Sequence, residues 1–176
     1  MPEQRQAVFA YIAAGSSIEA SKHLDAAMTE LRTAVDVTAV STVYRTPAIN
    51  RPGDPDFLNC VFQVRTTLSP RTLKFSVLHE IERRLGRIRS ADRYAPRSID
   101  LDLILLGDET CDEPDLTIPH PDLSRWFVWI PLLELSPTLS VPGLGELRKL
   151  GFVYPGQGRR HPVPHVTRLL QRRLNQ

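Results

Sequence analysis

The amino-acid sequence predicts a single α+β domain in which strands and helices follow one another along the chain. Its 176 residues, 41% of them hydrophobic, are enough for one core of ordinary size and too few for two. Apolar runs of strand-like length or alternation occur at several places, and segments with apolar residues at helical spacing lie between them. We therefore expect one compact unit with one functional site.

The first two elements are a strand and a helix. The apolar run Val8–Ala14 has the length of a buried strand, and glycine and serine follow it at once. Ser16 and Glu19 have the spacing of a capping box, which predicts a helix from Glu19 to about Arg32. Its apolar residues repeat at helical spacing and form one stripe: Ala20, Leu24, Ala27, Met28 and Leu31.

Two further strands are predicted on either side of a long loop. β-branched residues dominate Val37–Tyr44, and apolar and polar residues alternate in Phe57–Thr66. The joining segment, Arg45–Asp56, contains three prolines and a glycine, which makes it too long and too stiff for a tight hairpin. An exposed loop of this kind often carries function.

The second half of the repeating pattern is a helix followed by a strand. Ser69 is placed to cap a helix, Pro70 suits its first turn, and Gly86 ends it. After a polar loop, the run Ile99–Leu106 is typical of a central strand. The order βαββαβ predicts a ferredoxin-like plait, an antiparallel sheet with its helices on one face.

The remainder of the chain is assigned more coarsely. We expect a further strand at Phe127–Ile130, a helical turn at Pro131–Leu135 and a basic amphipathic helix at Val166–Leu174. Residues 1–140 would form the domain that carries the functional site. Residues 141–176 would be an extension that packs on the same domain or is partly disordered.

Composition limits the possible partners and compartment. Twenty-two basic residues against 20 acidic ones give a net charge of only +2, which does not by itself imply a nucleic-acid partner. The longest N-terminal apolar run is too short to span a membrane. Two cysteines without metal-ligand spacing fit a reducing cytosol. We expect a cytoplasmic monomer, because the sequence contains no pattern that indicates an oligomer.

Two carboxylates on one strand are the first candidate site residues. Residues two apart in a strand point to the same face, so Asp100 and Asp102 would lie side by side among apolar neighbours. Their mutual repulsion and loss of hydration would be offset by a hard cation such as Mg²⁺. The alternative is a pair of exposed carboxylates bonded to arginines.

An arginine cluster immediately precedes these carboxylates. Its planar guanidinium groups suit phosphate oxygens, and nearby acidic residues favour a metal-bridged polyphosphate: Arg83, Arg84, Arg87, Arg89, Arg93 and Arg97. Arg83 and Arg84 could merely favour the end of their helix. The sequence lacks a phosphate-binding glycine loop and a dinucleotide fingerprint, so side chains would have to hold the phosphates.

A flat ligand could be recognised on the neighbouring strand. Phe57 and Asn59 share a strand face, where the ring could stack and the amide could hydrogen-bond an edge, although Phe57 alone could equally be core. His161 and His165 suggest a metal, but the prolines between them forbid the helix that would align two imidazoles.

Six segments in order resemble the motifs of the 6-hydroxymethyl-7,8-dihydropterin pyrophosphokinase family. They are Gly15-Ser16-Ser17, Val43-Tyr44-Arg45-Thr46-Pro47, Asp56-Phe57-Leu58-Asn59, Gly86-Arg87-Ile88-Arg89, Pro96-Arg97-Ser98-Ile99-Asp100-Leu101-Asp102 and Thr117-Ile118-Pro119-His120. The likeness extends from about Val8 to Pro137. The segment ending in the two aspartates is a specific signature of that family.

The resemblance implies a reaction and a set of site residues. Pyrophosphate would pass from ATP to the pterin hydroxymethyl group, releasing AMP. Asp100 and Asp102 would hold two Mg²⁺ ions, and Arg87 and Arg97 would close on the phosphates. The resemblance implies nucleotide contacts at Glu82, Arg89, Tyr94, Leu103, Thr117, His120 and Arg125, and pterin contacts at Thr46, Pro47, Ile49, Phe57, Asn59 and Phe127.

Some positions depart from the family pattern, and other functions compete. Ser17 stands where the family usually has Asn, Phe57 often corresponds to Tyr, and Asp115 falls where some members place an arginine. A ferredoxin-like sheet could also bind RNA, but none of the strands here carries the aromatic motif of that class. A paralogue that is inactive or accepts another substrate is the second alternative.

Overall fold

The computed structural model describes residues 5–48, 51–92, 94–155 and 160–176. Within these residues, six strands form the main sheet, and their pairings are all antiparallel. The chain is therefore an α+β protein built on an antiparallel sheet, as its sequence predicts.

The middle strand of the sheet is β4 (Phe57–Thr66), and the first strand of the chain, β1 (Val8–Ser16), lies between β4 and the edge strand β5 (Asp100–Leu106). The hydrogen-bonded order is β10 (His161–Pro162), β3 (Tyr44–Thr46), β4, β1 and β5, and β2 (Asp36–Val40) also pairs with β4. Two small hairpins join β6 (Cys111–Glu113) to β7 (Leu116–Ile118) and β8 (Ser140–Val141) to β9 (Gly145–Glu146).

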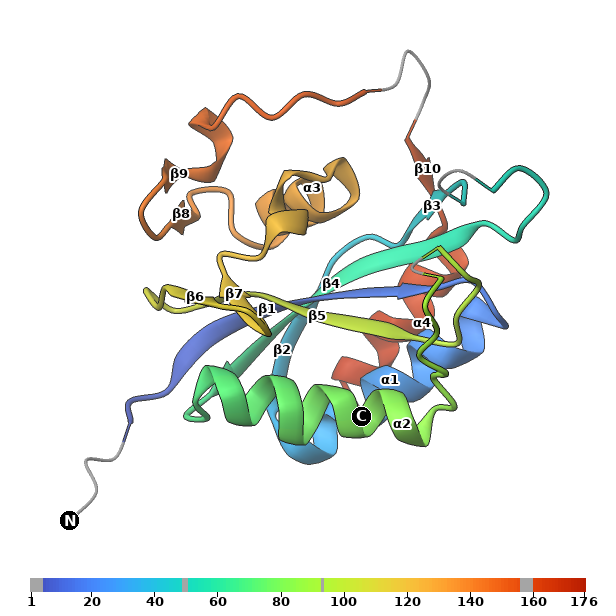
Figure 1. The fold of residues 1–176 in the computed structure, drawn as a ribbon, viewed down its shortest axis with the longest axis horizontal. Coiled ribbons are helices and arrows are strands. Elements are labelled where there is room, and N and C mark those ends of the chain that lie inside the picture. The colour runs from blue at the N-terminus through green and yellow to red at the C-terminus, as the bar shows by residue number, and fades with distance from the viewer. Residues whose placement is uncertain (1–4, 49–50, 93, 156–159) are drawn as a thin grey trace.

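One face of the sheet is covered by three helical elements. These are α1 (Ala20–Ala34), a π-helical stretch (Thr72–Leu78) that continues into α2 (His79–Arg84), and α4 (Pro164–Leu174). Figure 1 shows all of them on the same side of the sheet. The larger core lies there and includes the fully buried Ile12, Leu24, Met28, Leu31, Phe62, Leu73 and Leu103. Alternate residues of each strand point to this face of the sheet and contribute their side chains to the core.

The opposite face is covered by a helix, which corrects two sequence expectations. Residues Trp126–Leu135 form α3, whereas a strand was expected at Phe127–Ile130 and helices were expected on one face alone. The segment is apolar almost all round, so its periodicity could not separate a strand from a buried helix. Its Val128 and Leu132 pack on Tyr11 and Leu105 in a second core.

The expected strand Val37–Tyr44 is divided into β2 and β3. The Ser41 hydroxyl accepts a hydrogen bond from the Val61 backbone N–H at 2.9 Å, which takes the place of a backbone acceptor in the ladder. Two residues later, the Val43 carbonyl accepts from the Val163 N–H at 2.8 Å. The chain thus leaves β4 and turns toward the C-terminal segment before it pairs with β4 again.

The expected capping box at the start of the first helix is also wrong. Glu19 precedes α1 in the left-handed region at φ 43°, and no side chain caps the helix. Ser16 is instead the last residue of β1, and its hydroxyl donates to the Ser98 carbonyl. This contact ties the end of β1 to the segment that leads into β5.

The C-terminal helix packs on the body of the protein. Val166 and Leu170 of α4 are buried in the larger core. Arg173 forms an ion pair with Asp25 of α1 at 2.9 Å. Across the described ranges, every helix is too short or too polar to cross a membrane.

Candidate active site

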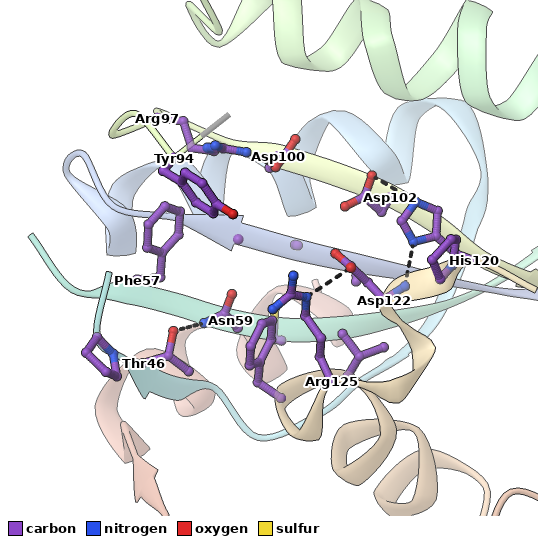
Figure 2. Close-up of a pocket in the computed structure, with 18 residues that line it drawn as sticks. Thr46, Phe57, Asn59, Tyr94, Arg97, Asp100, Asp102, His120, Asp122 and Arg125 are labelled. Carbon is purple, nitrogen blue, oxygen red and sulfur yellow. Dashed lines mark hydrogen bonds and ion pairs between the residues drawn. The ribbon is translucent and has the colours of Figure 1, made fainter. Parts of the chain in front are cut away.

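A cavity of ≈430 Å³ lies where β1, β4 and β5 meet the 3₁₀ turn Pro121–Ser124 and the start of α3. Figure 2 shows its labelled side chains converging from β3, β4, β5, the loop before β5 and the segment that contains the 3₁₀ turn. Its lining is Ala13, Ala14, Gly15, Thr46, Pro47, Phe57, Asn59, Cys60, Tyr94, Arg97, Asp100, Asp102, His120, Pro121, Asp122, Arg125, Phe127 and Val128.

The register of the sheet explains why there is room for a cavity. Gly15 of β1 lies opposite Asn59 of β4 on one side and opposite Asp100 of β5 on the other. Paired residues point to the same face, so Asn59 and Asp100 flank a position that has no side chain. Ala13 lies opposite Asp102 in the same way. Small residues on β1, the strand between β4 and β5, therefore form the floor between two walls of polar side chains.

The two aspartates have different neighbours. Asp100 forms an ion pair with Arg97 and a longer one with Arg87, whose Nη2 is 3.6 Å from its carboxylate. Among the ion-pair contacts of the described residues, the basic side chain nearest to Asp102 is that of His120, with 3.7 Å between Nε2 and Oδ1. Asp100 is therefore neutralised by arginine, whereas Asp102 is not.

The surroundings of Asp102 favour its protonated form. Burial, followed by repulsion from Asp100 and Asp122, raises the pKa of Asp102 to about 7. Burial lowers the pKa of His120, so its imidazole is neutral near pH 7. Nδ1 of His120 accepts a hydrogen bond from the Asp122 backbone N–H at 3.2 Å, which leaves the proton on Nε2, the nitrogen that faces Asp102.

Glu82 is hydrogen-bonded to β5, the strand that carries the two aspartates. Its carboxylate accepts a hydrogen bond from the Leu101 backbone N–H at 2.8 Å and binds Arg89 at 2.7 Å. The side chain is only 3% exposed, and burial raises its pKa above the usual value. The Arg87 N–H donates to the Glu82 carbonyl at 2.9 Å. One residue thus links α2, the arginine loop and β5.

Arg87 and Arg97 are held close to the carboxylates. Burial lowers the pKa of Arg87, and its Nε is a buried nitrogen without a hydrogen-bond partner in the described part of the chain. Ser17 fixes the other arginine, because its hydroxyl accepts from the Arg97 N–H at 3.0 Å and its own N–H donates to the Arg97 carbonyl at 3.0 Å.

The other end of the cavity combines an aromatic ring with a buried polar pair. Asn59 Nδ2 donates to Thr46 Oγ1 at 2.8 Å, and each residue is only 7% exposed. This bond leaves the amide oxygen of Asn59 available to a ligand donor. Phe57 also lines the cavity, and the Arg97 guanidinium lies 5.8 Å from the centre of its ring.

Most of the sequence-predicted site residues line this cavity, but some lie behind or beside it. The predicted residues outside the lining are Glu82, Arg87, Arg89, Leu103 and Thr117. Leu103 is a core residue with 2% exposure, and Ile49 lies outside the described residues.

Sequence reasoning missed Asp122 and the structural use of Gly15. Asp122 binds Arg125 Nε at 2.9 Å and orients His120 through its own N–H. Asp122 lies two residues after His120 and three before Arg125. Its position between two predicted nucleotide contacts is the signal in the sequence that could have identified it.

Comparison with known proteins decides the family. The model of the 7,8-dihydro-6-hydroxymethylpterin-pyrophosphokinase (HPPK) family matches residues 11–137. This chain belongs to the HPPK family. Pyrophosphokinase activity in folate biosynthesis follows, with ATP and a pterin as substrates.

Curated relatives are named 2-amino-4-hydroxy-6-hydroxymethyldihydropteridine pyrophosphokinase. The Bacillus subtilis protein is 37% identical over 72% of this chain and 77% of its own length. The Pseudomonas aeruginosa protein is 34% identical over 84% and 93% of the two chains. The Synechocystis protein is 40% identical, but the match spans 64% of this chain and 56% of that protein.

Solved structures agree on the fold. The Plasmodium falciparum HPPK-DHPS protein with pterin and p-hydroxybenzoate superposes with a TM-score of 0.63 at 13% identity. The match covers 85% of this chain and 42% of that longer chain. The HPPK family match ends at residue 137, so the C-terminal segment lies beyond it.

Proposed function

We propose that the cavity binds ATP and 6-hydroxymethyl-7,8-dihydropterin side by side, with two Mg²⁺ ions held by Asp100 and Asp102. The observation that carries this proposal is the register of three strands. Gly15 of β1 lies between Asp100 of β5 and Asn59 of β4, so an anionic wall faces a polar and aromatic one across a position without a side chain.

The carboxylates fit magnesium by their chemistry. Mg²⁺ is usually bound through one or two carboxylates together with substrate phosphates and water. Within the described residues, no group of three or more acidic, histidine or cysteine side chains gathers as a metal site, which fits an ion that relies on substrate oxygens. Burial and repulsion from Asp100 and Asp122 raise the pKa of Asp102, and a bound cation would offset both effects. Bound Mg²⁺ would neutralise charge on the phosphate oxygens.

The pterin would occupy the end of the cavity formed by β3, β4 and α3. Phe57 and Phe127 would stack on its ring, while Asn59, held by Thr46, would hydrogen-bond its edge. Pro47 would close the slot from the segment after β3, and the family resemblance adds Ile49 as a pterin contact.

The nucleotide would occupy the end nearest β5. Its contacts would come from Glu82, Arg89, Tyr94, Leu103, Thr117, His120 and Arg125. Arg87 and Arg97 would exchange their contacts with Asp100 for phosphate oxygens once Mg²⁺ neutralises that carboxylate. His120, neutral and protonated on Nε2, could donate a hydrogen bond to the nucleotide.

The reaction then depends on positioning and charge neutralisation. The pterin hydroxyl oxygen attacks the β-phosphorus of ATP, the bond from that phosphorus to the α-phosphate oxygen breaks, and AMP leaves. The hydroxyl proton passes to solvent. Arg87 and Arg97 stabilise charge that develops on the phosphate oxygens, so no strong general base is required.

The same proposal includes the architecture and setting of the protein. The strand order β5-β1-β4-β2 supports classification as a ferredoxin-like plait. Residues 1–140 would form the catalytic domain, with residues 141–176 as an extension packed on it. We also propose a monomer that acts in the cytoplasm and has no nucleic-acid partner.

The test is to identify the nucleotide product. Protein, Mg²⁺, ATP and 6-hydroxymethyl-7,8-dihydropterin should give AMP and the pterin diphosphate in equal amounts. ADP as the stoichiometric product would contradict pyrophosphoryl transfer. No nucleotide product at all would identify a paralogue that is inactive or uses another substrate.

A further inference from the structure

The C-terminal segment, residues 151–155 and 160–174 of the described chain, includes β10, which lies along the outer edge of β3. His161 and Pro162 of β10 pair with Arg45 and Tyr44 of β3, and Figure 1 shows β10 beside β3 with α4 below it. Beyond that pairing, Thr167 of α4 also contacts the chain just before β3. Its hydroxyl accepts a hydrogen bond from the Val43 backbone N–H at 2.9 Å.

The strand held in this way is short and forms one edge of the cavity. On its inner side, Thr46 lies opposite Phe57 of β4, and its hydroxyl accepts from Asn59 at 2.8 Å. A three-residue strand followed by a proline-rich loop has few hydrogen bonds of its own to define its position. The C-terminal segment therefore supplies one of the two sides on which β3 is anchored.

A second contact of the same segment reaches the opposite wall of the cavity. The ring of Tyr154 packs edge-on against Trp126, with centroids 5.1 Å apart. Trp126 in turn packs against Tyr44 of β3 at 5.7 Å and against Phe127 of the cavity lining at 5.9 Å. The Arg160 guanidinium lies 5.9 Å from the ring centre of Tyr154.

Two further hydrogen bonds join these two walls. Glu134 of α3 accepts from the Tyr44 hydroxyl and from the Thr42 backbone N–H, the latter at 2.9 Å. Burial, strengthened by Glu134, raises the pKa of Tyr44 to about 12, so its hydroxyl keeps the proton that it donates. β3 and α3 are thus coupled, and the C-terminal segment contacts both.

We propose that the C-terminal segment is a positioning element of the pterin slot, with Thr167 and Tyr154 as its positioning residues. It fixes Thr46 through β3 and Phe127 through Trp126, so the slot is formed before the pterin enters. Pre-formed sites bind more tightly because less ordering accompanies binding. This inference rests on the proposed location of the pterin, and it concerns residues beyond the family match at 11–137.

Two variants separate positioning from general stability. Thr167→Val keeps the size of the side chain and removes the acceptor for Val43, and Tyr154→Leu removes the ring that supports Trp126. Thr167→Ser keeps the hydroxyl and should behave as wild type. Arg173→Gln is the matched control, because it breaks the ion pair between the last turn of α4 and Asp25 of α1 and leaves the contact of Thr167 with Val43 in place.

The measurement is calorimetric binding of α,β-methylene-ATP with Mg²⁺, then of 6-hydroxymethyl-7,8-dihydropterin to that complex. Thr167→Val and Tyr154→Leu should raise the Kd of the pterin about five- to tenfold, as expected for a lost buried contact, and leave the nucleotide Kd unchanged. Arg173→Gln should lower only the melting temperature.

Three results would overturn the proposal. They are unchanged pterin affinity in both variants, equal losses for pterin and nucleotide, or a loss of pterin affinity in Arg173→Gln that matches theirs. Wild-type protein that fails to bind the pterin would overturn the proposed function as well. That outcome is distinct from wild-type binding with unaffected variants, which removes the positioning role alone.

Discussion

Asp102→Asn separates the roles of the two aspartates, because it removes a charge and keeps the size of the side chain. In the structure Asp102 faces a neutral histidine and two other carboxylates, whereas Asp100 is neutralised by Arg97 and Arg87. Without metal, the charge on Asp102 is therefore unfavourable. We expect the amide to stabilise the metal-free protein and to abolish most of its activity.

The size of the stabilisation follows from the pKa of Asp102, which rises from 3.8 to about 7 in the folded protein. A shift of that size corresponds to an upper bound of about 4 kcal/mol. The side chain is 36% exposed, so water screens much of this energy. We expect the free energy of unfolding to increase by about 1–2 kcal/mol at pH 8, or roughly 3–6 °C in melting temperature.

The sign of this effect depends on pH. A carboxyl group whose pKa is raised on folding binds its proton more tightly in the native state, so stability falls as pH rises from about 4 through about 7. The advantage of Asp102→Asn should therefore be partial at pH 5, about a third of its full size, and complete above pH 7. Melting curves of the metal-free proteins at pH 5 and pH 8 measure it.

Activity should move in the opposite direction. Loss of an anionic ligand where phosphate charge is neutralised should reduce turnover by about a thousandfold or more, assayed as AMP formation. Asp100→Asn is the matched control. It should also lose activity but melt earlier, because Arg87 and Arg97, with side chains 12% and 13% exposed, lose the carboxylate that neutralises them. An Asp102→Asn protein that melts early and keeps Mg²⁺-dependent turnover would refute the reasoning.

Three other predictions follow from single contacts. In Gly15→Ala, the new Cβ would lie 3.0 Å from Asn59 Oδ1, so the KM for pterin should rise about tenfold in initial-rate assays while that for ATP stays unchanged; equal changes would contradict it. Glu82→Gln removes the ion pair with Arg89 and should raise the KM for ATP about fivefold. Because burial raises the pKa of Glu82, the free energy of unfolding of this variant should fall less with rising pH than that of the wild type. Mg²⁺ binding should ionise Asp102 and therefore release close to one proton at pH 6 and almost none at pH 8.5. Calorimetry in buffers of different ionisation enthalpy measures this release, and identical heats of binding at pH 6 would contradict it.

Local patterns predicted most of the elements because those patterns depend on neighbours in the chain. The strand Phe57–Thr66 has its predicted bounds, since alternation of apolar and polar residues reports a strand with two different faces. The C-terminal helix begins only two residues before the predicted Val166, because its apolar stripe is clear.

Where local patterns were ambiguous, packing decided the structure. The apolar run that forms α3 fits a strand or a buried helix equally well, and the uncovered face of the sheet settled the choice. The break between β2 and β3 depends on Ser41 and on partners in the C-terminal segment, more than a hundred residues away. No window of sequence contains both sides of such a contact.

At the candidate site, too, local geometry predicted some features and tertiary packing decided others. The spacing of Asp100 and Asp102, and of Phe57 and Asn59, placed each pair on one strand face from backbone geometry alone. The hydrogen bond from Leu101 to Glu82 and the orientation of His120 could not be read in that way.

The sequence by itself determined which chemical groups are present and which of them share a face of their own strand or helix. Only the tertiary structure decided that Asn59, Gly15 and Asp100 lie in one row across three strands, and that the C-terminal segment supports β3. The physical reason is the range of the interactions. Spacing within an element follows from local backbone geometry, whereas register between strands is selected by burial of the whole core.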